Sequence, residues 1–193
     1  MNRLKVFSTI LFVLLSFSAF SQQFKGGLLL GMSTSQIDGD SQSGYKKLGF
    51  FSGVSVATDF SKIMGAKIEL YYIGKGAKKV VDGVEEFKTD LHFVEMPFLI
   101  TIKPINLFEL DLGIDCSYLI SSKLYEYGAV VPEGLYDMRN FNLGAIASAS
   151  YYFTQSLGFN LRFDYSLKPI KNNPNWYSNN LSFGLVYKIN NSE

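Results

Sequence analysis

Apolar and polar residues alternate one by one along much of this chain. The clearest stretch is LGFNLRFDYSLK at 157–168, where the odd positions are Leu, Phe or Tyr and the even positions are Gly, Asn, Arg, Asp, Ser or Lys. Successive side chains of a strand point to opposite faces, so this stretch has one apolar and one polar face. The same period predicts eight strands, at about 24–33, 48–60, 65–76, 91–103, 108–120, 139–153, 157–168 and 179–190.

Short and long connections alternate between these strands. The short ones fall at 61–64, 104–107 and 154–156, whereas the long ones fall at 34–47, 77–90, 121–138 and 169–178 and contain DGDSQSG, VDGVEE, VPEG and KNNPN. Such residues are typical of loops. In an up-and-down arrangement, all four long loops would leave one end and both termini would lie at the other. Bacterial outer-membrane barrels have this asymmetry.

Two architectures share the alternation. A soluble barrel or sandwich, such as a periplasmic lipocalin-like binder, hides its apolar face, whereas a membrane barrel turns that face to lipid and fills its lumen with the polar face. The polar face here carries charges of both signs in equal number, which suits a confined interior where charges must pair. The cations are Lys25, Lys67, Lys75, Lys103, Arg162, Lys168 and Lys188, and the anions are Asp59, Glu69, Glu95, Glu109, Asp111, Asp115 and Asp164.

Aromatic residues of the apolar face gather near the strand ends. We expect them to form the two interfacial belts of a membrane barrel; the principal candidates are Phe60, Phe108, Phe153 and Tyr187 toward the short turns and Tyr72, Tyr118 and Tyr165 toward the long loops. The strands also exceed the length of about five or six residues that is usual in globular proteins. These observations predict an all-β fold, an eight-stranded antiparallel up-and-down transmembrane β-barrel.

The N-terminus has the layout of a cleaved secretory signal peptide. Arg3 and Lys5 precede an apolar run, and Ala19 and Ser21 place small residues before Gln22. An uncleaved membrane anchor is the alternative, although the run is short for a spanning helix of about 20 residues. We therefore expect a signal peptide at 1–21 and a barrel domain at 22–193, located in the bacterial outer membrane with periplasmic termini.

Composition and reactive residues indicate little chemistry. The formal net charge of +1 provides no electrostatic basis for a nucleic-acid partner. His92 and Cys116 both fall on the apolar outer face, so we expect no metal, cofactor or catalytic site. A hydrolase acting on lipid would need a serine within reach of His92, and none is evident on that face. The chain is therefore not expected to be an enzyme.

Several motifs resemble the PorT-like outer-membrane β-barrel domain family, small barrels of Bacteroidetes-type bacteria. The resemblance rests on GGLLLGMSTS at 26–35, GFFSGV at 49–54, IELYYIGKGAK at 68–78, HFVEMPFLITIK at 92–103 and LGFNLRFDYSL at 157–167. The family pattern Glu-Leu-x-Tyr-x-x-Lys-Gly is met by residues 69–76, and aromatic-x-Glu-x-Pro by residues 93–97. The resemblance implies the barrel and an accessory role in secretion. The chain ends INNSE, without the terminal Phe common in such barrels.

An eight-stranded barrel is just wide enough for side chains to fill its interior. We therefore expect a non-enzymatic outer-membrane protein with a plugged lumen, which contacts lipid and reaches a protein partner or surface ligand through loops 34–47, 77–90, 121–138 and 169–178. The alternatives are a narrow solute or ion channel and a lipid-modifying enzyme. The expected lumen charge network is Lys67, Glu69, Lys75, Glu95, Glu109, Asp111, Asp115, Arg162, Asp164 and Lys188.

Overall fold

The computed structural model describes residues 24–40, 44–132 and 137–189, so the predicted signal peptide lies outside it. Among these residues no helix is long and apolar enough to cross a membrane. The described residues form nine strands: β1 (Phe24–Asp38), β2 (Lys47–Asp59), β3 (Met64–Val81), β4 (Val84–Ile105), β5 (Phe108–Glu126), β6 (Ala129–Val130), β7 (Phe141–Tyr152), β8 (Leu157–Ser166) and β9 (Tyr177–Ile189).

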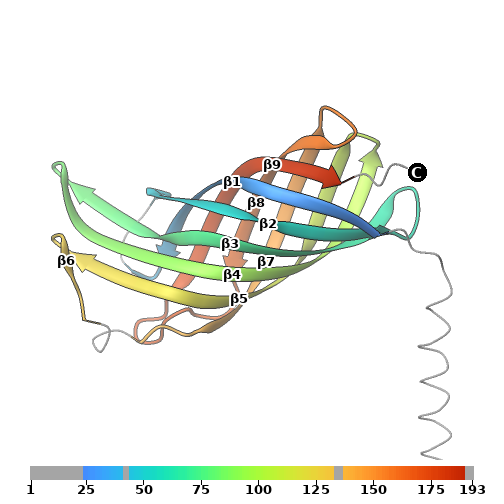
Figure 1. The fold of residues 1–193 in the computed structure, drawn as a ribbon. Coiled ribbons are helices and arrows are strands. Elements are labelled where there is room, and N and C mark those ends of the chain that lie inside the picture. Colours follow the sequence, from blue (N-terminus) through green and yellow to red (C-terminus); the bar gives the residue numbers. More distant parts are fainter. Residues whose placement is uncertain (1–23, 41–43, 133–136, 190–193) are drawn as a thin grey trace, which may run out of the picture.

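Eight of these strands close into a barrel (Figure 1). Each pairs antiparallel with its neighbours along the chain, and β1 pairs with β9 to complete the ring. The short β6 pairs with the end of β5. Both ends of the described chain lie at the end of the barrel where the connections are short. The predicted eight-stranded antiparallel barrel is confirmed.

The predicted long loop 77–90 is almost entirely strand, and here the prediction was wrong. β3 continues to Val81 and β4 starts at Val84, with only Asp82 and Gly83 between them. Both turn residues have positive φ, which is the geometry of the tight hairpin turn that Asp-Gly favours. The polar residues of 77–90 form a paired ladder with ion pairs across it, because Lys78 contacts Glu85 and Lys79 contacts Glu86. Figure 1 shows this hairpin projecting beyond the ring.

Residues 121–138 also contain strand. β5 runs to Glu126, and Tyr127 and Gly128 form a second tight turn with positive φ that leads into β6. β1 likewise extends to Asp38, opposite Tyr177 of β9. Lys171, within the predicted loop 169–178, forms isolated bridges with Met138 and Trp176. The long-loop end is therefore an extension of the sheet more than a set of irregular loops.

Side chains are exposed or buried according to the predicted faces of the strands. The apolar side chains are exposed and the polar ones are buried, which is the reverse of a soluble protein. On β8 the exposed fraction is 42% for Phe163 and 1% for its neighbour Arg162. The same alternation of exposed apolar and buried polar residues runs through β3, β4, β5 and β7. Since apolar surface is costly in water, a continuous apolar exterior is the surface of a barrel set in lipid. Lys168, predicted to face the lumen, lies beyond the end of β8 and is exposed, so this assignment was wrong.

Candidate functional site in the barrel lumen

Side chains fill the barrel interior in successive groups from the short-turn end to the long-loop end. These groups are the short-turn cluster around Glu109 and Asp111, the arginine layer of Arg162 and Glu69, the acidic cluster around Lys75, and the apolar cap around Trp176. Every strand of the ring contributes at least one inward residue, because alternate positions of each strand point inward. The interior therefore collects residues that are far apart in sequence.

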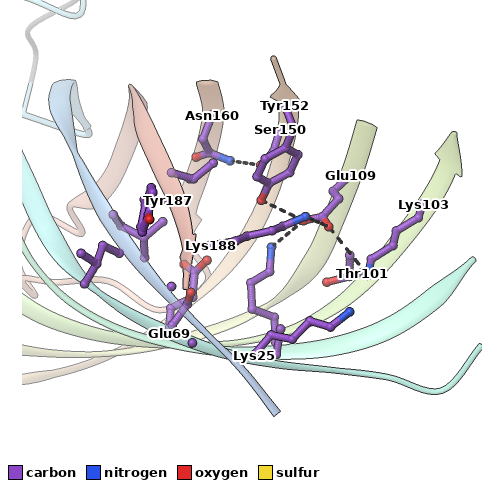
Figure 2. Close-up of a pocket in the computed structure, with 18 of the residues that line it drawn as sticks. Lys25, Glu69, Thr101, Lys103, Glu109, Ser150, Tyr152, Asn160, Tyr187 and Lys188 are labelled. Carbon is purple, nitrogen blue, oxygen red and sulfur yellow. Dashed lines mark hydrogen bonds and ion pairs between the residues drawn. The ribbon is translucent and has the colours of Figure 1, made fainter. Parts of the chain in front are cut away.

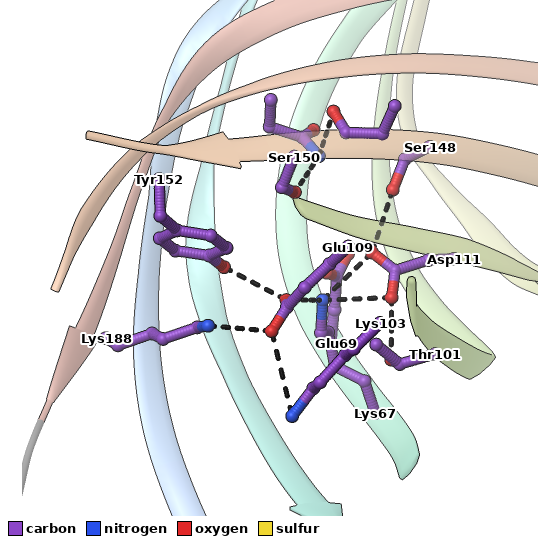
Figure 3. Close-up of polar contacts among 12 residues, drawn as sticks. Lys67, Glu69, Thr101, Lys103, Glu109, Asp111, Ser148, Ser150, Tyr152 and Lys188 are labelled. Carbon is purple, nitrogen blue, oxygen red and sulfur yellow. Dashed lines mark hydrogen bonds and ion pairs between the residues drawn. The ribbon is translucent and has the colours of Figure 1, made fainter. Parts of the chain in front are cut away.

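Glu109, at the start of β5, is the centre of the short-turn cluster (Figure 3). Lys188 Nζ lies 2.7 Å from Glu109 Oε1, Lys67 Nζ lies 3.5 Å from Oε2 and Lys103 Nζ lies 3.8 Å from Oε1. The hydroxyl of Tyr152 donates a hydrogen bond to Oε2 at 3.1 Å. A single carboxylate thus serves three ammonium groups, each supplied by a different strand.

Asp111 lies two residues further along the same face of β5 and completes the cluster. Lys67 Nζ donates to its two oxygens at 2.9 and 3.1 Å. The hydroxyls of Thr101 and Ser148 donate to Asp111 at 2.6 and 3.0 Å. These donors come from β3, β4 and β7, so the Asp111 carboxylate ties four strands together. Hydrogen bonds of this kind offset the cost of burying the charge.

The arginine layer lies deeper in the lumen. Arg162 of β8 and Glu69 of β3 are each 1% exposed, and Arg162 Nη1 lies 2.8 Å from Glu69 Oε2. The guanidinium also lies over the rings of Tyr71 and Phe51, at 5.0 and 5.7 Å from their centroids. The arginine layer is therefore a buried ion pair packed against two aromatic rings inside the barrel.

The acidic cluster contains three carboxylates around one lysine. Lys75 Nζ lies 2.7 Å from Glu95 Oε1 and also pairs closely with Asp164. Asn180 donates to Asp164 at 2.8 Å. Asp115 is 3% exposed, and its Oδ1 has no hydrogen-bond partner among the described residues. This cluster therefore has more carboxylates than cations.

The apolar cap covers the long-loop end. Trp176 and Ile170 come from the connection between β8 and β9, and they are buried together with Ile37 of β1 and Leu124 of β5. Phe87 packs edge-on against Trp176, with ring centroids 6.4 Å apart. Residues 169–178 are predicted as a polar loop, and that prediction does not include this cap. The apolar residues Ile170 and Trp176 within that stretch were the available signal.

A cavity of about 280 Å³ remains open next to the short-turn cluster (Figure 2). Its wall includes Lys25, Lys67, Lys103 and Lys188 together with Glu109. The lining residues lie at the β1 start, the β2 end, the β4 end and the β9 end, so the cavity occupies the short-turn half of the lumen.

The structure brings the ten residues of the expected charge network into the barrel interior, where they form separate clusters instead of one network. Nine are buried, and Lys188 is partly buried near the rim. Of the expected interfacial aromatics, four are well exposed on the outside, namely Phe60, Tyr118, Phe153 and Tyr187. The other three are partly buried, namely Tyr72, Phe108 and Tyr165. Tyr165 stacks on Tyr177 at 6.2 Å.

His92 lies outside the lumen, and a 2.5 Å hydrogen bond joins its Nδ1 to the Tyr72 hydroxyl. A register shift beside His92 makes Ser121 its partner across the β4–β5 pair, so a serine does lie opposite this histidine, contrary to the expectation from the sequence. Cys116 is partly buried and unpaired by any disulfide. Within the described residues, no group of three or more His, Cys, Asp or Glu side chains is arranged to hold a metal ion.

The sequence matches the model of a known protein family. Residues 16–172 match the family described as outer membrane protein beta-barrel domain. No curated protein matches the chain.

Solved structures of small outer-membrane barrels resemble the fold. Ail, the attachment invasion locus protein of Yersinia pestis, matches with a TM-score of 0.56 and 13% identity over 86% of this chain and 99% of Ail. Its complex with the heparin analogue sucrose octasulfate matches with a TM-score of 0.54 and 12% identity over the same shares. Neisserial surface protein A matches with a TM-score of 0.60 and 14% identity, over 85% of this chain and 97% of that protein. At this identity the likeness concerns the fold.

Proposed function

Because the chain belongs to the outer membrane protein beta-barrel domain family, we propose that it is a non-enzymatic outer-membrane protein that binds a partner through its long-loop end. The barrel anchors the protein in lipid, and the hairpin of residues 77–90 together with the β5–β6 hairpin forms the contact surface. The observation that carries this proposal is the extension of β3, β4 and β5 beyond the ring as paired sheet.

The extension is ordered by its own contacts, which is what a recognition surface needs. Lys78–Glu85 and Lys79–Glu86 ion pairs cross the β3–β4 hairpin, and Lys88 lies over the Tyr125 ring at 5.1 Å. The tips expose Val81, Val84, Tyr127 and Val130. Apolar and aromatic side chains on a rigid support are the usual anchors of protein interfaces.

The filled lumen supports a role that does not depend on transport. The arginine layer and the apolar cap occupy successive levels of an eight-stranded barrel, which has little room beyond its own side chains. Ail, the attachment invasion locus protein of Yersinia pestis, has a similar fold, and its name agrees with a role at the cell surface for a barrel of this shape. A version of this role as an accessory to secretion follows from the PorT-like motifs.

The proposed orientation puts the short turns in the periplasm and the extension outside the cell, as in bacterial outer-membrane barrels generally. We also propose that residues 1–21 are a signal peptide that is cleaved during export. Protease added to intact cells is then expected to cut the 77–90 hairpin and to spare the short turns.

The test removes the tip of the hairpin and leaves the barrel intact. Deleting Val80, Val81, Val84, Glu85 and Glu86 joins Lys79 to Phe87, which already lie opposite each other, through the existing Asp82-Gly83 turn. The expected result is loss of the partner that crosslinks to the full-length protein on intact cells. The deletion variant is expected to keep the heat-modifiable gel migration of a folded barrel. An unchanged crosslinking pattern in a folded deletion variant would contradict the proposal.

A further inference from the structure

We propose that the cavity at the short-turn end is a binding site for a small solute that carries a carboxylate or phosphate group. The exposed fraction of the side chains falls steadily with depth, from 46% at Lys25 through 28% at Lys188 to 5% at Glu109. The cavity therefore opens at the short-turn end. This site is independent of the partner surface at the opposite end.

The wall of the cavity has an excess of hydrogen-bond donors. Lys25, Lys67, Lys103 and Lys188 bring four ammonium groups, each with three N–H bonds. Glu109 is shared among three of them, and Asp59 is shared between Lys25 and Lys103. Lys67 uses its three N–H bonds on Glu109 and Asp111, whereas Lys25, Lys103 and Lys188 each donate one hydrogen bond to Asp59 or Glu109 and have N–H bonds left for a further acceptor. An oxyanion supplies the acceptors that this wall lacks.

Charge in this half of the lumen also favours an anion. The cavity wall and the groups paired with it hold five cations, Lys25, Lys67, Lys103, Lys188 and Arg162. They hold four anions, Asp59, Glu69, Glu109 and Asp111. The surplus is one positive charge, and it lies in a partly enclosed site where screening by water is reduced. The acidic cluster, with its opposite excess, lies beyond the arginine layer.

The geometry sets the size of the solute and its route. Arg162 and Glu69 close the inner side, so a bound molecule enters and leaves by the short-turn end. A volume of about 280 Å³ is at the lower limit for ligand pockets of about 300–1,000 Å³, which selects a small solute. Tyr152, Ser150 and Asn160 add polar contacts at the side of the cavity (Figure 2). The Lys188 ammonium lies 3.5 Å from the centroid of the Tyr152 ring and 2.7 Å from Glu109 Oε1, so it belongs to the wall of the cavity.

The test measures binding of inorganic phosphate and of malonate to the refolded full chain in neutral detergent, by titration calorimetry at low salt. Sodium chloride at matched ionic strength provides the blank. Binding of either probe by the wild type is expected, with about tenfold weaker affinity when Lys103→Gln and Lys188→Gln are combined, because two charged hydrogen bonds are lost. Lys62→Gln is the matched control, since Lys62 is exposed in a short turn at the same end and does not line the cavity.

The outcomes separate clearly. Loss of binding in the double variant with unchanged binding in Lys62→Gln supports the site, and the probe that binds identifies phosphate or carboxylate as the preferred group. No binding of either probe to the wild type, or equal affinity in all three proteins, overturns it. If the double variant does not show the gel migration of a folded barrel, Lys25→Gln replaces it, because Lys25 lies at the exposed rim. Equal affinity in folded Lys25→Gln and wild type then overturns the proposal.

Discussion

Individual residues of the lumen differ in whether their charge is compensated. Arg162 and Glu69 compensate each other at 2.8 Å in a fully buried setting. Asp115, in contrast, is buried in the acidic cluster and forms no ion pair with any described residue, because Lys75 pairs with Glu95 and Asp164. This difference leads to two predictions about single side chains: removing a paired charge should lower the free energy of unfolding, whereas removing the unpaired Asp115 charge should leave it unchanged or raise it.

Breaking the arginine layer from one side is expected to be costly. Arg162→Gln leaves the Glu69 carboxylate buried without its cation, which should lower the free energy of unfolding by about 3–5 kcal/mol. The double variant Arg162→Gln/Glu69→Gln removes both charges and is expected to recover a large part of that loss. Urea titration in detergent micelles, followed by tryptophan fluorescence, measures all three proteins. Additive losses in the double variant would contradict the direct pairing.

The acidic cluster should respond in the opposite way at one position. Asp115→Asn removes a carboxylate that no lysine pairs with closely, so stability at neutral pH is expected to stay the same or rise. Asp164→Asn removes a partner of Lys75 and an acceptor of Asn180 and should destabilise by about 1–3 kcal/mol. The same urea titration compares the two. Equal destabilisation by both substitutions would show that Asp115 is compensated as well as Asp164.

At the scale of elements, the β3–β4 hairpin depends on a glycine and on an ion pair at its base. Gly76 has φ of 145°, and a Cβ there would lie 1.9 Å from the carbonyl oxygen of Thr89. At the same level, Lys47 of β2 reaches across to Asp90 of β4, the register partner of Gly76, with Nζ 2.8 Å from Oδ1. The glycine allows the close backbone approach, and the ion pair connects two strands that are not neighbours in the ring.

The base of the hairpin is expected to loosen in acid. Burial alone would raise the pKa of Asp90, but Lys47, His92 and Lys88 outweigh it and hold that pKa below its ordinary value. A lowered pKa in the folded state stabilises the hairpin above the ordinary carboxylate pKa of about 3.9, and this contribution is lost as the pH falls through the lower folded value. Amide hydrogen exchange in residues 77–90 should therefore become less protected below about pH 4.

Asp90→Asn provides the control for that pH dependence. Protection of residues 77–90 is corrected for the intrinsic exchange rate at each pH. In this variant it should be lower than in the wild type at neutral pH. It should also change less than in the wild type between about pH 6 and about pH 3, the range that contains the Asp titration. Strands of the ring such as β8 serve as the internal reference. A variant with the same pH response as the wild type would exclude Asp90 as the titrating group.

At the scale of the whole molecule, the arrangement of charged and apolar layers leads us to expect a lumen closed to ions. The arginine layer and the apolar cap lie in series along the lumen, so an ion would have to pass both. We expect no steady single-channel conductance from the wild-type protein in planar bilayers. Phe51→Ala combined with Arg162→Ala widens one layer only and is expected to remain closed because of the cap around Trp176. Stable openings in the wild type would favour the channel alternative.

The strand period and the turn chemistry in the sequence already determined the ring of eight strands and, where apolar and polar residues alternate strictly, the two faces of a strand. Alternate side chains must point to opposite sides, so LGFNLRFDYSLK could be assigned an apolar and a polar face without any knowledge of its neighbours. The Asp82-Gly83 hairpin was also readable in principle, because Asp-Gly is a strong signal for a two-residue turn. The prediction of a loop over 77–90 gave too much weight to polar composition.

Only the tertiary structure decided which charges meet and where the lumen is closed. Lys67 pairs with Asp111, 44 residues away, and Lys75 with Asp164, 89 residues away, because the stagger between strands sets the level of each side chain. The apolar cap combines residues of β1, β4, β5 and the β8–β9 connection, and the local pattern at none of these places predicts their contact. Period determines the face a residue occupies, but closure of the barrel determines its height and its partner.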